Sequence, residues 1–84
     1  MANSIKDPIS VSIIGGSGYT GAELIRLVSK HPNFQLIQVV ANRNADKKIQ
    51  DIFPHLRHLK LPDFISFDQM DFNNVDLIFC ALPH

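Results

Sequence analysis

The chain has 84 residues, in which eight lysine and arginine residues balance eight aspartate and glutamate residues. This length corresponds to one domain or a piece of one, because domains commonly have about 100–150 residues. The balanced charge gives no overall field that would favour nucleic acid or an anionic membrane surface. An apolar fraction of 45% with 19% charged residues is typical of a globular chain and excludes an intrinsically disordered one.

The sequence also carries no sign of membrane insertion or secretion. Its apolar runs are far shorter than the roughly 20 residues that span a bilayer, and the polar start from Met1 to Asp7 lacks the apolar core of a signal peptide. The single cysteine, Cys80, cannot form an internal disulfide, which agrees with a reducing compartment. We therefore expect a cytoplasmic protein.

The first predicted element is a buried strand over residues 9–14, which leads directly into a glycine-rich turn. Residues 11–21 read V-S-I-I-G-G-S-G-Y-T-G and contain all four glycines of the chain. The glycines fit two registers, Gly16-x-Gly18-x-x-Gly21 or Gly15-x-x-Gly18-x-x-Gly21. Without Cβ atoms, such a turn lets the backbone bend sharply and approach a pyrophosphate. A strand before it and a helix after it are the context that this motif requires.

A helix is predicted from Tyr19 to Lys30. Thr20 and Glu23 have the spacing of a capping box, although the sequence does not fix which residue is the N-cap. The N–H groups and dipole of the helix start would stabilise a phosphate. Gly21 lies on the apolar stripe of this helix, where a glycine permits close packing on the sheet. That stripe continues through Leu24, Ile25 and Val28. The helix is expected to stop at His31, because Pro32 disfavours helical geometry in the residue before it.

Further strands alternate with short helical or turn segments. Residues 34–41, F-Q-L-I-Q-V-V-A, alternate partly and are rich in β-branched residues, so they predict a strand. A short helix over 47–53 and a short strand over 64–67 follow. Residues 75–81, V-D-L-I-F-C-A, predict a strand buried on both faces after the turn at Asn73-Asn74. Cys80 would then be a buried, protonated, structural side chain.

These elements predict an α/β fold with a Rossmann-type parallel sheet that is incomplete. We interpret residues 1–84 as the N-terminal portion of an NAD(P)-binding domain. Right-handed crossovers place the strand over 34–41 on one side of the first strand, and the strand over 75–81 on the other. The glycine turn, the segment after residue 41 and the exit Leu82-Pro83-His84 should therefore meet at one edge of the sheet.

The segment after the second strand indicates which dinucleotide binds. A protein that holds the ribose of NAD usually places Asp or Glu about 20 residues beyond the glycines, yet residues 41–45, A-N-R-N-A, contain no carboxylate. Arg43 could instead pair with the 2′-phosphate of NADP or lie on the adenine, with help from Lys47 or Lys48. The alternative is that these are solvated loop charges. NADP is the predicted cofactor. Its predicted binding residues are Gly15, Gly16, Ser17, Gly18, Tyr19, Thr20, Gly21, Asn42, Arg43, Leu82, Pro83 and His84.

No catalytic or metal-binding group is predicted in the chain. His84 could contact cofactor or substrate, or be an ordinary loop histidine, and the two interpretations stay open. His31, His55 and His58 are expected at the surface, and His55-x-x-His58 lacks further nearby metal ligands. Four aspartates in loops and turns form no acid–base pair: Asp63, Asp68, Asp71 and Asp76.

Residues 15–24, G-G-S-G-Y-T-G-A-E-L, together with His31-Pro32 and Ala81-Leu82-Pro83-His84, closely resemble the start of N-acetyl-gamma-glutamyl-phosphate reductases. The resemblance spans most of the chain and is less close to the related aspartate-semialdehyde dehydrogenases. Gly16, where the family usually has alanine, and the polar Asn42 depart from its typical pattern.

The resemblance implies an NADPH-dependent enzyme of arginine biosynthesis that interconverts N-acetyl-glutamyl phosphate and N-acetyl-glutamate semialdehyde. At full length it implies a small-molecule substrate and a homo-oligomer. The family's cysteine nucleophile and catalytic histidine match no residue here, because Cys80 precedes the nucleophile motif and His84 belongs to the cofactor-side loop. We therefore expect that the catalytic domain is absent and that this chain alone is inactive. The alternatives are a stand-alone nucleotide-binding or interaction module and, less favoured, an NAD-dependent dehydrogenase of another substrate.

Overall fold

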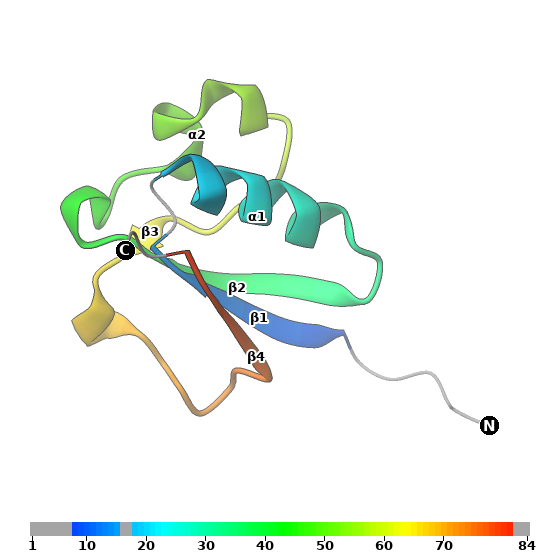
Figure 1. The fold of residues 1–84 in the computed structure, drawn as a ribbon. Helices are drawn as coiled ribbons and strands as arrows, with labels where there is room; N and C mark the ends of the chain where they lie inside the picture. Colours follow the sequence, from blue (N-terminus) through cyan, green and yellow to red (C-terminus); the bar gives the residue numbers. More distant parts are fainter. Residues whose placement is uncertain (1–7, 16–17, 82–84) are drawn as a thin grey trace.

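The computed structural model describes residues 8–15 and 18–81, which form a four-stranded parallel sheet in the order β3-β2-β1-β4 (Figure 1). The predicted α/β fold with an incomplete Rossmann-type sheet is confirmed. The elements are β1 (Ile9–Ile14), α1 (Tyr19–Lys30), β2 (Phe34–Val40), α2 (Ile49–Ile52), β3 (Phe64–Ile65) and β4 (Leu77–Cys80), with 3₁₀ turns η1 (Asn42–Asn44), η2 (Pro54–Leu56) and η3 (Phe67–Gln69). Among the described residues, no helix is long and apolar enough to cross a membrane.

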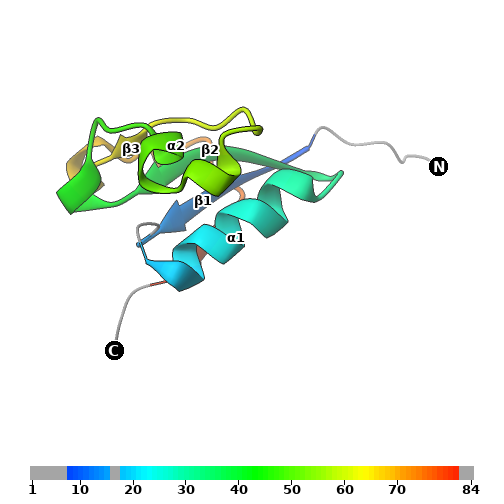
Figure 2. The same cartoon turned by 90° about the horizontal axis from the view of Figure 1, so that it is seen from above.

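The helices and the last crossover lie on opposite faces of the sheet. α1 and α2 lie on one face, and the chain from β3 to β4 passes on the other (Figures 1 and 2). β1, β2 and β3 follow one another in one direction across the sheet, whereas β4 returns to the far side of β1. A right-handed crossover needs the opposite face when the direction reverses. The reversal between β1 and β4 is the switch point at which open α/β sheets bind ligands.

The core lies between the sheet and the helices. Val11 and Ile13 of β1 and Ile25 and Val28 of α1 are buried in it. Because side chains alternate along a strand and recur every three to four residues along a helix, these spacings aim both sets at each other. The other buried members are Val39, Ala41, Ile49, Leu56 and Phe64.

A one-residue irregularity in β2 explains why its sequence alternates only in part. Val11 pairs with Leu36, but Ser12 pairs with Gln38, so Ile37 is an extra residue in the ladder. A bulge of this kind resets the side-chain alternation by one position. Leu36 therefore packs against the same apolar core as Val39, three residues later.

The opposite face is held by the side-chain amide of Gln38. Its Nε2 donates to the buried Ser12 Oγ and to the Asp71 carbonyl oxygen, both at 2.9 Å. In return, the Asp71 N–H donates to Gln38 Oε1 at 2.7 Å. The start of β4 is fixed in a similar way, because the Ser10 N–H donates to Asp76 Oδ2 and the Asp76 N–H donates to the Ser10 carbonyl, both at 2.9 Å. Polar contacts thus hold the crossover that positions β4.

Three element predictions need correction. The helix expected over 47–53 is a single turn, α2, followed by η2. The strand expected over 64–67 ends at residue 65, and η3 begins at residue 67. The strand expected over 75–81 is β4, which is shorter and not buried on both faces. Leu77 and Ile78 are 36% and 38% exposed, and Cys80 is exposed. These residues are exposed because β4 is an edge strand of the four-stranded sheet. An apolar run in the sequence therefore did not guarantee that the strand is buried.

Candidate cofactor site

The carboxyl ends of β1, β2 and β4 meet at one edge of the sheet. Ile14 is in register with Val40 of β2 and with Cys80 of β4. Beyond the strands, the Gly15 N–H donates to the Val40 carbonyl and the Ala81 N–H donates to the Ile14 carbonyl, both at 2.8 Å. The chain segments that leave these strands therefore start side by side. The predicted convergence holds up to Ala81, and Leu82, Pro83 and His84 lie outside the described residues.

The glycine turn combines one position whose backbone conformation favours glycine with one at which the fold itself does not require it. Gly15 has φ of 86°, a left-handed conformation that side chains with a Cβ rarely adopt. Gly18 has φ of −99° and ψ of −178°, which any residue can adopt, and a Cβ there would meet no described atom within 4 Å. The space in front of Gly18 is open. Gly16 and Ser17, which complete the predicted turn, lie outside the described residues.

The N-terminus of α1 is open as well. The helix begins after Gly18, which has no side chain to cap it, and its first turn contains no acidic residue. The first N–H groups of any α-helix lack an intrahelical partner, and together with the dipole they attract an anion. Tyr19 and Thr20 are exposed in this turn, whereas Gly21 is buried, as its predicted role in packing requires.

Thr20 and Glu23 have the spacing of a capping box but do not form one, and the N-cap, which the sequence left open, is Gly18. Thr20 is the second residue of α1 rather than its N-cap, and the Glu23 carboxylate pairs with Arg26. A hydrogen bond from Arg26, together with its charge, holds the pKa of Glu23 below its usual 4.5. The ion pair draws the carboxylate along the helix and away from its start. No acidic group of the described helix therefore competes with an anion for the N–H groups of the first turn.

The segment after β2 is a turn that carries the predicted arginine. Residues 42–44 form η1, and hydrogen bonds from Asn44 to the Ala41 carbonyl and from Lys47 to the Asn44 carbonyl close it at 2.8 and 3.0 Å. Arg43 is exposed on η1, and no salt bridge joins it to another residue among those described. Lys47 and Lys48 are also exposed. The guanidinium of Arg43 is therefore available to an anionic ligand at the edge where β2 ends.

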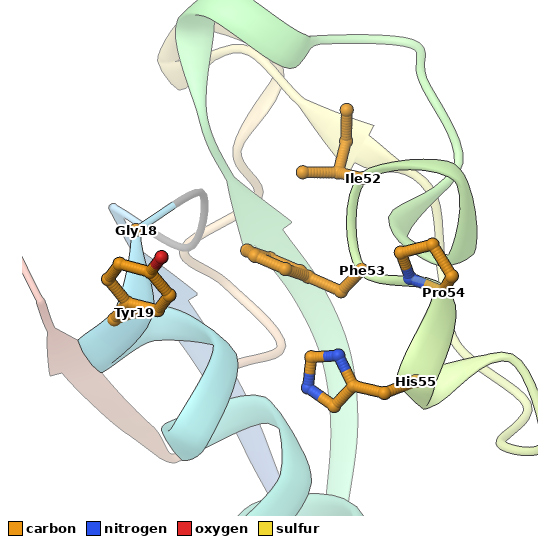
Figure 3. A pocket seen from close by; sticks show the side chains of 6 residues that line it. All are labelled: Gly18, Tyr19, Ile52, Phe53, Pro54 and His55. Carbon is orange, nitrogen blue, oxygen red and sulfur yellow. The ribbon is translucent and has the colours of Figure 1, made fainter.

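A groove of about 410 Å³ runs from the glycine turn to the segment after α2. Its walls are Gly18 and Tyr19 on one side, and on the other Ile52, Phe53, Pro54 and His55 (Figure 3). Phe53 extends towards the glycine turn (Figure 3), and its ring meets that of His55 edge-on at 6.0 Å between centroids. This volume lies within the about 300–1,000 Å³ usual for small-molecule sites.

Sequence reasoning placed His55 at the surface, and it is exposed, as are His31 and His58. It did not assign Phe53 or His55 to a site. The signal was present but weak: residues 52–55, I-F-P-H, form a short apolar run that ends in an imidazole. Only the packing of this segment opposite α1 makes it a wall of the groove. Within the described part of the chain, no cluster of His, Cys, Asp or Glu could hold a metal ion.

The strand order of this parallel sheet reverses beside a glycine turn, and the N-terminus of α1 is open at that turn. This arrangement defines a dinucleotide-binding α/β domain. The family described as "Semialdehyde dehydrogenase, NAD binding domain" matches residues 10–84. The chain belongs to this family.

Curated relatives share about half of the aligned residues with this chain. An N-acetyl-gamma-glutamyl-phosphate reductase of Ruegeria pomeroyi is 51% identical over 74 residues, which are 88% of this chain and 22% of the relative. A probable chloroplastic N-acetyl-gamma-glutamyl-phosphate reductase of Arabidopsis thaliana is 47% identical over 90% of this chain and 19% of its own length. These relatives confirm the resemblance seen in the sequence. The chain spans about a fifth of their length.

The fold is also found in a solved structure. A crystal structure of aspartate semialdehyde dehydrogenase with NADP from Candida albicans superimposes with a TM-score of 0.73 at 26% sequence identity. The similarity covers 92% of this chain and 24% of the Candida protein.

Proposed function

We propose that this chain forms the N-terminal part of the NADP-binding domain of an N-acetyl-gamma-glutamyl-phosphate reductase. The whole enzyme would use NADPH to interconvert N-acetyl-glutamyl 5-phosphate and N-acetyl-glutamate 5-semialdehyde in arginine biosynthesis. The observation that carries the proposal is the open space in front of Gly18 at the N-terminus of α1. Because glycine has no side chain, Gly18 leaves the first N–H groups of the helix uncapped. The curated relatives, which carry this enzyme name over nearly the whole of this chain, support the choice of reaction.

The residues present suit a dinucleotide pyrophosphate. Gly15 makes the sharp turn and Gly18 leaves room for a close approach. The N–H groups of the first turn of α1 would donate to the phosphate oxygens, and the absence of an acidic group from that turn removes the main source of repulsion. The proposed pyrophosphate-binding site also includes Gly16, Ser17, Tyr19, Thr20 and Gly21. Leu82, Pro83 and His84 would border the same crevice from the exit of β4.

Arg43 would select NADP over NAD. Its exposed guanidinium stands one residue into the turn after β2, where dinucleotide-binding proteins contact the adenosine ribose. A guanidinium can donate two parallel hydrogen bonds to a phosphate. Asn42 would line the same turn. The similar aspartate semialdehyde dehydrogenase of Candida albicans has a crystal structure with NADP, which supports this choice.

When bound, NADPH supplies a hydride to the substrate carbonyl. The residues of this chain would bind and orient the cofactor and take no chemical step. Cys80, the one cysteine of the chain, lies in strand β4, at a position that precedes the family's nucleophile motif. We therefore place the catalytic cysteine and histidine in a catalytic domain that is not among these residues. The whole enzyme would act on a small molecule in the cytoplasm, without nucleic acid or membrane. The resemblance also implies that the whole enzyme is a homo-oligomer.

The test is a pair of titrations of the purified chain with NADPH and NADH, with binding followed through NMR chemical shifts of the backbone and side chains. We expect weak binding with a preference for NADPH. Arg43→Ala should remove most of that preference, because a charge-assisted pair is worth about 1.5–3 kcal/mol, or roughly 10- to 150-fold. Lys30→Ala, which removes an exposed cation at the other end of α1, is the control and should leave the preference unchanged.

Three results would overturn the proposal. An unchanged NADPH preference in Arg43→Ala would refute the role of Arg43. Reduction of an acyl phosphate by the isolated chain would refute the placement of the catalytic groups in another domain. Binding of neither nucleotide would favour an interaction module instead.

A further inference from the structure

We propose that β4 and the crossover that leads to it, residues 66–81, open as one unit while the rest of the sheet stays folded, and that a bound dinucleotide keeps this unit closed. We call these residues the β4 unit. The opening itself is a property of the fold and goes beyond the proposed function. The effect of the dinucleotide rests on the proposed function, since it assumes that NADPH binds where β1 and β4 meet.

The β4 unit contributes little to the apolar core. The buried core cluster of the described chain takes all its members from residues 11–64. Within the β4 unit, Met70 is buried and Phe79 packs partly against the core, whereas Phe72 of the crossover and Ile78 of β4 are 54% and 38% exposed. Opening the unit therefore exposes much less apolar surface than unfolding the whole chain, and it costs less free energy.

The crossover, on the face of the sheet away from α1 and α2 (Figure 1), keeps its own shape through local contacts. Ser66 and Gln69 form a capping box at η3, in which the Ser66 N–H donates to Gln69 Oε1 at 2.9 Å. The Asp71 carboxylate accepts hydrogen bonds from the Asn73 N–H at 2.9 Å and from Asn74 Nδ2 at 3.0 Å. These bonds join residues of the same short segment, so they do not depend on contact with the sheet.

Two polar clamps tie the β4 unit to the rest of the chain. Gln38 exchanges two hydrogen bonds with the backbone of Asp71 and donates a third to the Ser12 hydroxyl. Ser10 and Asp76 exchange two more. Hydrogen bonds contribute modestly to net stability, because water replaces the lost partners once the groups are exposed. The clamp at Gln38 matters most, since Ser12 is fully buried while the unit is closed.

The other edge strand, β3, is tied to the fold more firmly. Its Phe64 is fully buried, and the Phe64 N–H donates to the Lys47 carbonyl at 3.0 Å while its own carbonyl accepts from the Asp46 N–H at 2.7 Å. β3 therefore has backbone partners in addition to its pairing with β2. In the described chain, β4 pairs with β1 alone. The sheet should open at β4 rather than at β3.

The proposed dinucleotide crevice exists only while the β4 unit is closed. Open α/β sheets bind ligands at the carboxyl ends of the strands where the strand order reverses, here between β1 and β4. The Ala81 N–H donates to the Ile14 carbonyl at 2.8 Å, and Ile14 leads directly into Gly15. Departure of β4 thus removes one side of the crevice beside the glycine turn. A ligand that needs both sides shifts the equilibrium towards the closed form.

Hydrogen exchange of backbone amides in the full chain, followed by NMR at increasing urea concentrations below the unfolding transition, tests the opening. The N–H groups of Asp76 and Ala81, which donate to β1, report on the two ends of β4. The Ala41 N–H, which donates to the Ile65 carbonyl at 2.9 Å, reports on the rest of the sheet. After correction for intrinsic rates, Asp76 and Ala81 should exchange equally and at least about tenfold faster than Ala41. Their exchange should also depend less on urea, because less surface is exposed.

Three variants assign the exchange to the proposed contacts. Gln38→Leu should speed exchange at Asp76 and Ala81 by roughly 5- to 150-fold, because the closed form then leaves the Ser12 hydroxyl unsatisfied. Gln35→Leu, at an exposed position of the same strand, is the matched control and should leave these rates unchanged.

The third variant, Ile49→Val, shortens a fully buried side chain of α2, which begins next to the bridge between Lys48 and Asp63 beside β3. It should speed exchange at Ala41 by roughly 2- to 13-fold. Exchange at Ala81 should not change, because the core stays folded when the β4 unit opens.

NADPH tests the closure. At ten times its Kd, NADPH should slow exchange at Ala81 and Ala41 by the same factor, about tenfold, since it binds neither the open form nor the unfolded chain. If NADPH slows Ala41 but not Ala81, closure by the ligand is wrong. If NADPH slows neither amide, the proposed function fails and the closure with it, while the separate opening stands on its own measurements.

Two results would overturn the opening itself. Equal exchange and equal urea dependence at Ala81 and Ala41, or equal acceleration of both by Ile49→Val, would show that β4 leaves only when the whole chain unfolds. Unequal exchange at Asp76 and Ala81 would show that the ends of β4 fray separately rather than as one unit. Neither result would affect the proposed function, which the NADPH titration tests by itself.

Discussion

Replacement of Gly18 by alanine separates the demands of the fold from those of the ligand. The backbone at Gly18 has φ of −99° and ψ of −178°, which alanine can adopt, and a Cβ would meet no described atom within 4 Å. Removing glycine's extra freedom in the unfolded chain stabilises a protein by about 0.4–1 kcal/mol. Alanine is a poorer N-cap than glycine by roughly 0.5–1 kcal/mol. The two effects offset each other, so the free energy of unfolding should change by less than about 0.5 kcal/mol.

The same methyl group should impair cofactor binding. Under the proposed function, a phosphate bound at the start of α1 lies in the open space beside Gly18. Forcing an extra methyl group into such a contact costs about 1–3 kcal/mol. This corresponds to a loss of NADPH affinity of roughly 5- to 150-fold. Urea unfolding followed by circular dichroism measures the first quantity, and titration with NADPH measures the second.

Two further variants of the turn sharpen the test. Gly18→Asp supplies an N-cap carboxylate at the positive end of the helix dipole, so the free energy of unfolding should rise, while the negative charge should weaken NADPH more than alanine does. Gly15→Ala places a Cβ at φ of 86° and should cost about 1–2 kcal/mol of stability. The reasoning is refuted if Gly18→Ala keeps full NADPH affinity, or if it destabilises the fold by more than about 2 kcal/mol.

Two other predictions concern the scaffold. Gln38→Leu should lower the free energy of unfolding by about 1–3 kcal/mol in urea, because the buried Ser12 hydroxyl loses the hydrogen bond that Gln38 donates to it. Gln35→Leu, at an exposed position of β2, should not lower it, and equal losses in the two variants would contradict the role of Gln38. The Arg26 ion pair lowers the pKa of Glu23 from 4.5 in the folded chain, so its small stabilisation is present above that pH and is lost as the pH falls through the lowered pKa. The difference in unfolding free energy between the unaltered chain and Glu23→Gln should therefore shrink to zero in acid, and a difference that grows below pH 4.5 would contradict the pairing.

The regions in which sequence and structure agree are those in which local chemistry decides the conformation. The glycine turn, the helix that starts at Tyr19 and the stop at His31 depend on backbone freedom, apolar spacing and a proline, all of which act over a few residues. The parallel order of β1, β2 and β4 also followed from the sequence, because right-handed crossovers leave few arrangements.

The incorrect predictions depend on partners that are distant in the chain or that compete for the same group. Cys80 was expected to be buried because an apolar strand usually is, but its exposure depends on which strands lie beside β4. The spacing of Thr20 and Glu23 allowed a capping box, yet Glu23 had a competing partner one turn later in Arg26. Spacing shows which contacts are possible, and competition among neighbours decides which one forms.

The sequence by itself determined the type of site: a glycine turn between a strand and a helix, an arginine where NAD-binding proteins have a carboxylate, and the motif of one reductase family. Only the tertiary structure decided the shape of that site. It showed that the space before Gly18 is open, that Glu23 is drawn away from the helix start, and that Phe53 and Tyr19 face a common groove. The physical reason is the distance along the chain over which the deciding interactions act. Backbone conformation is set by neighbours in the chain, whereas a groove is set by two surfaces that the chain brings together from some thirty residues apart.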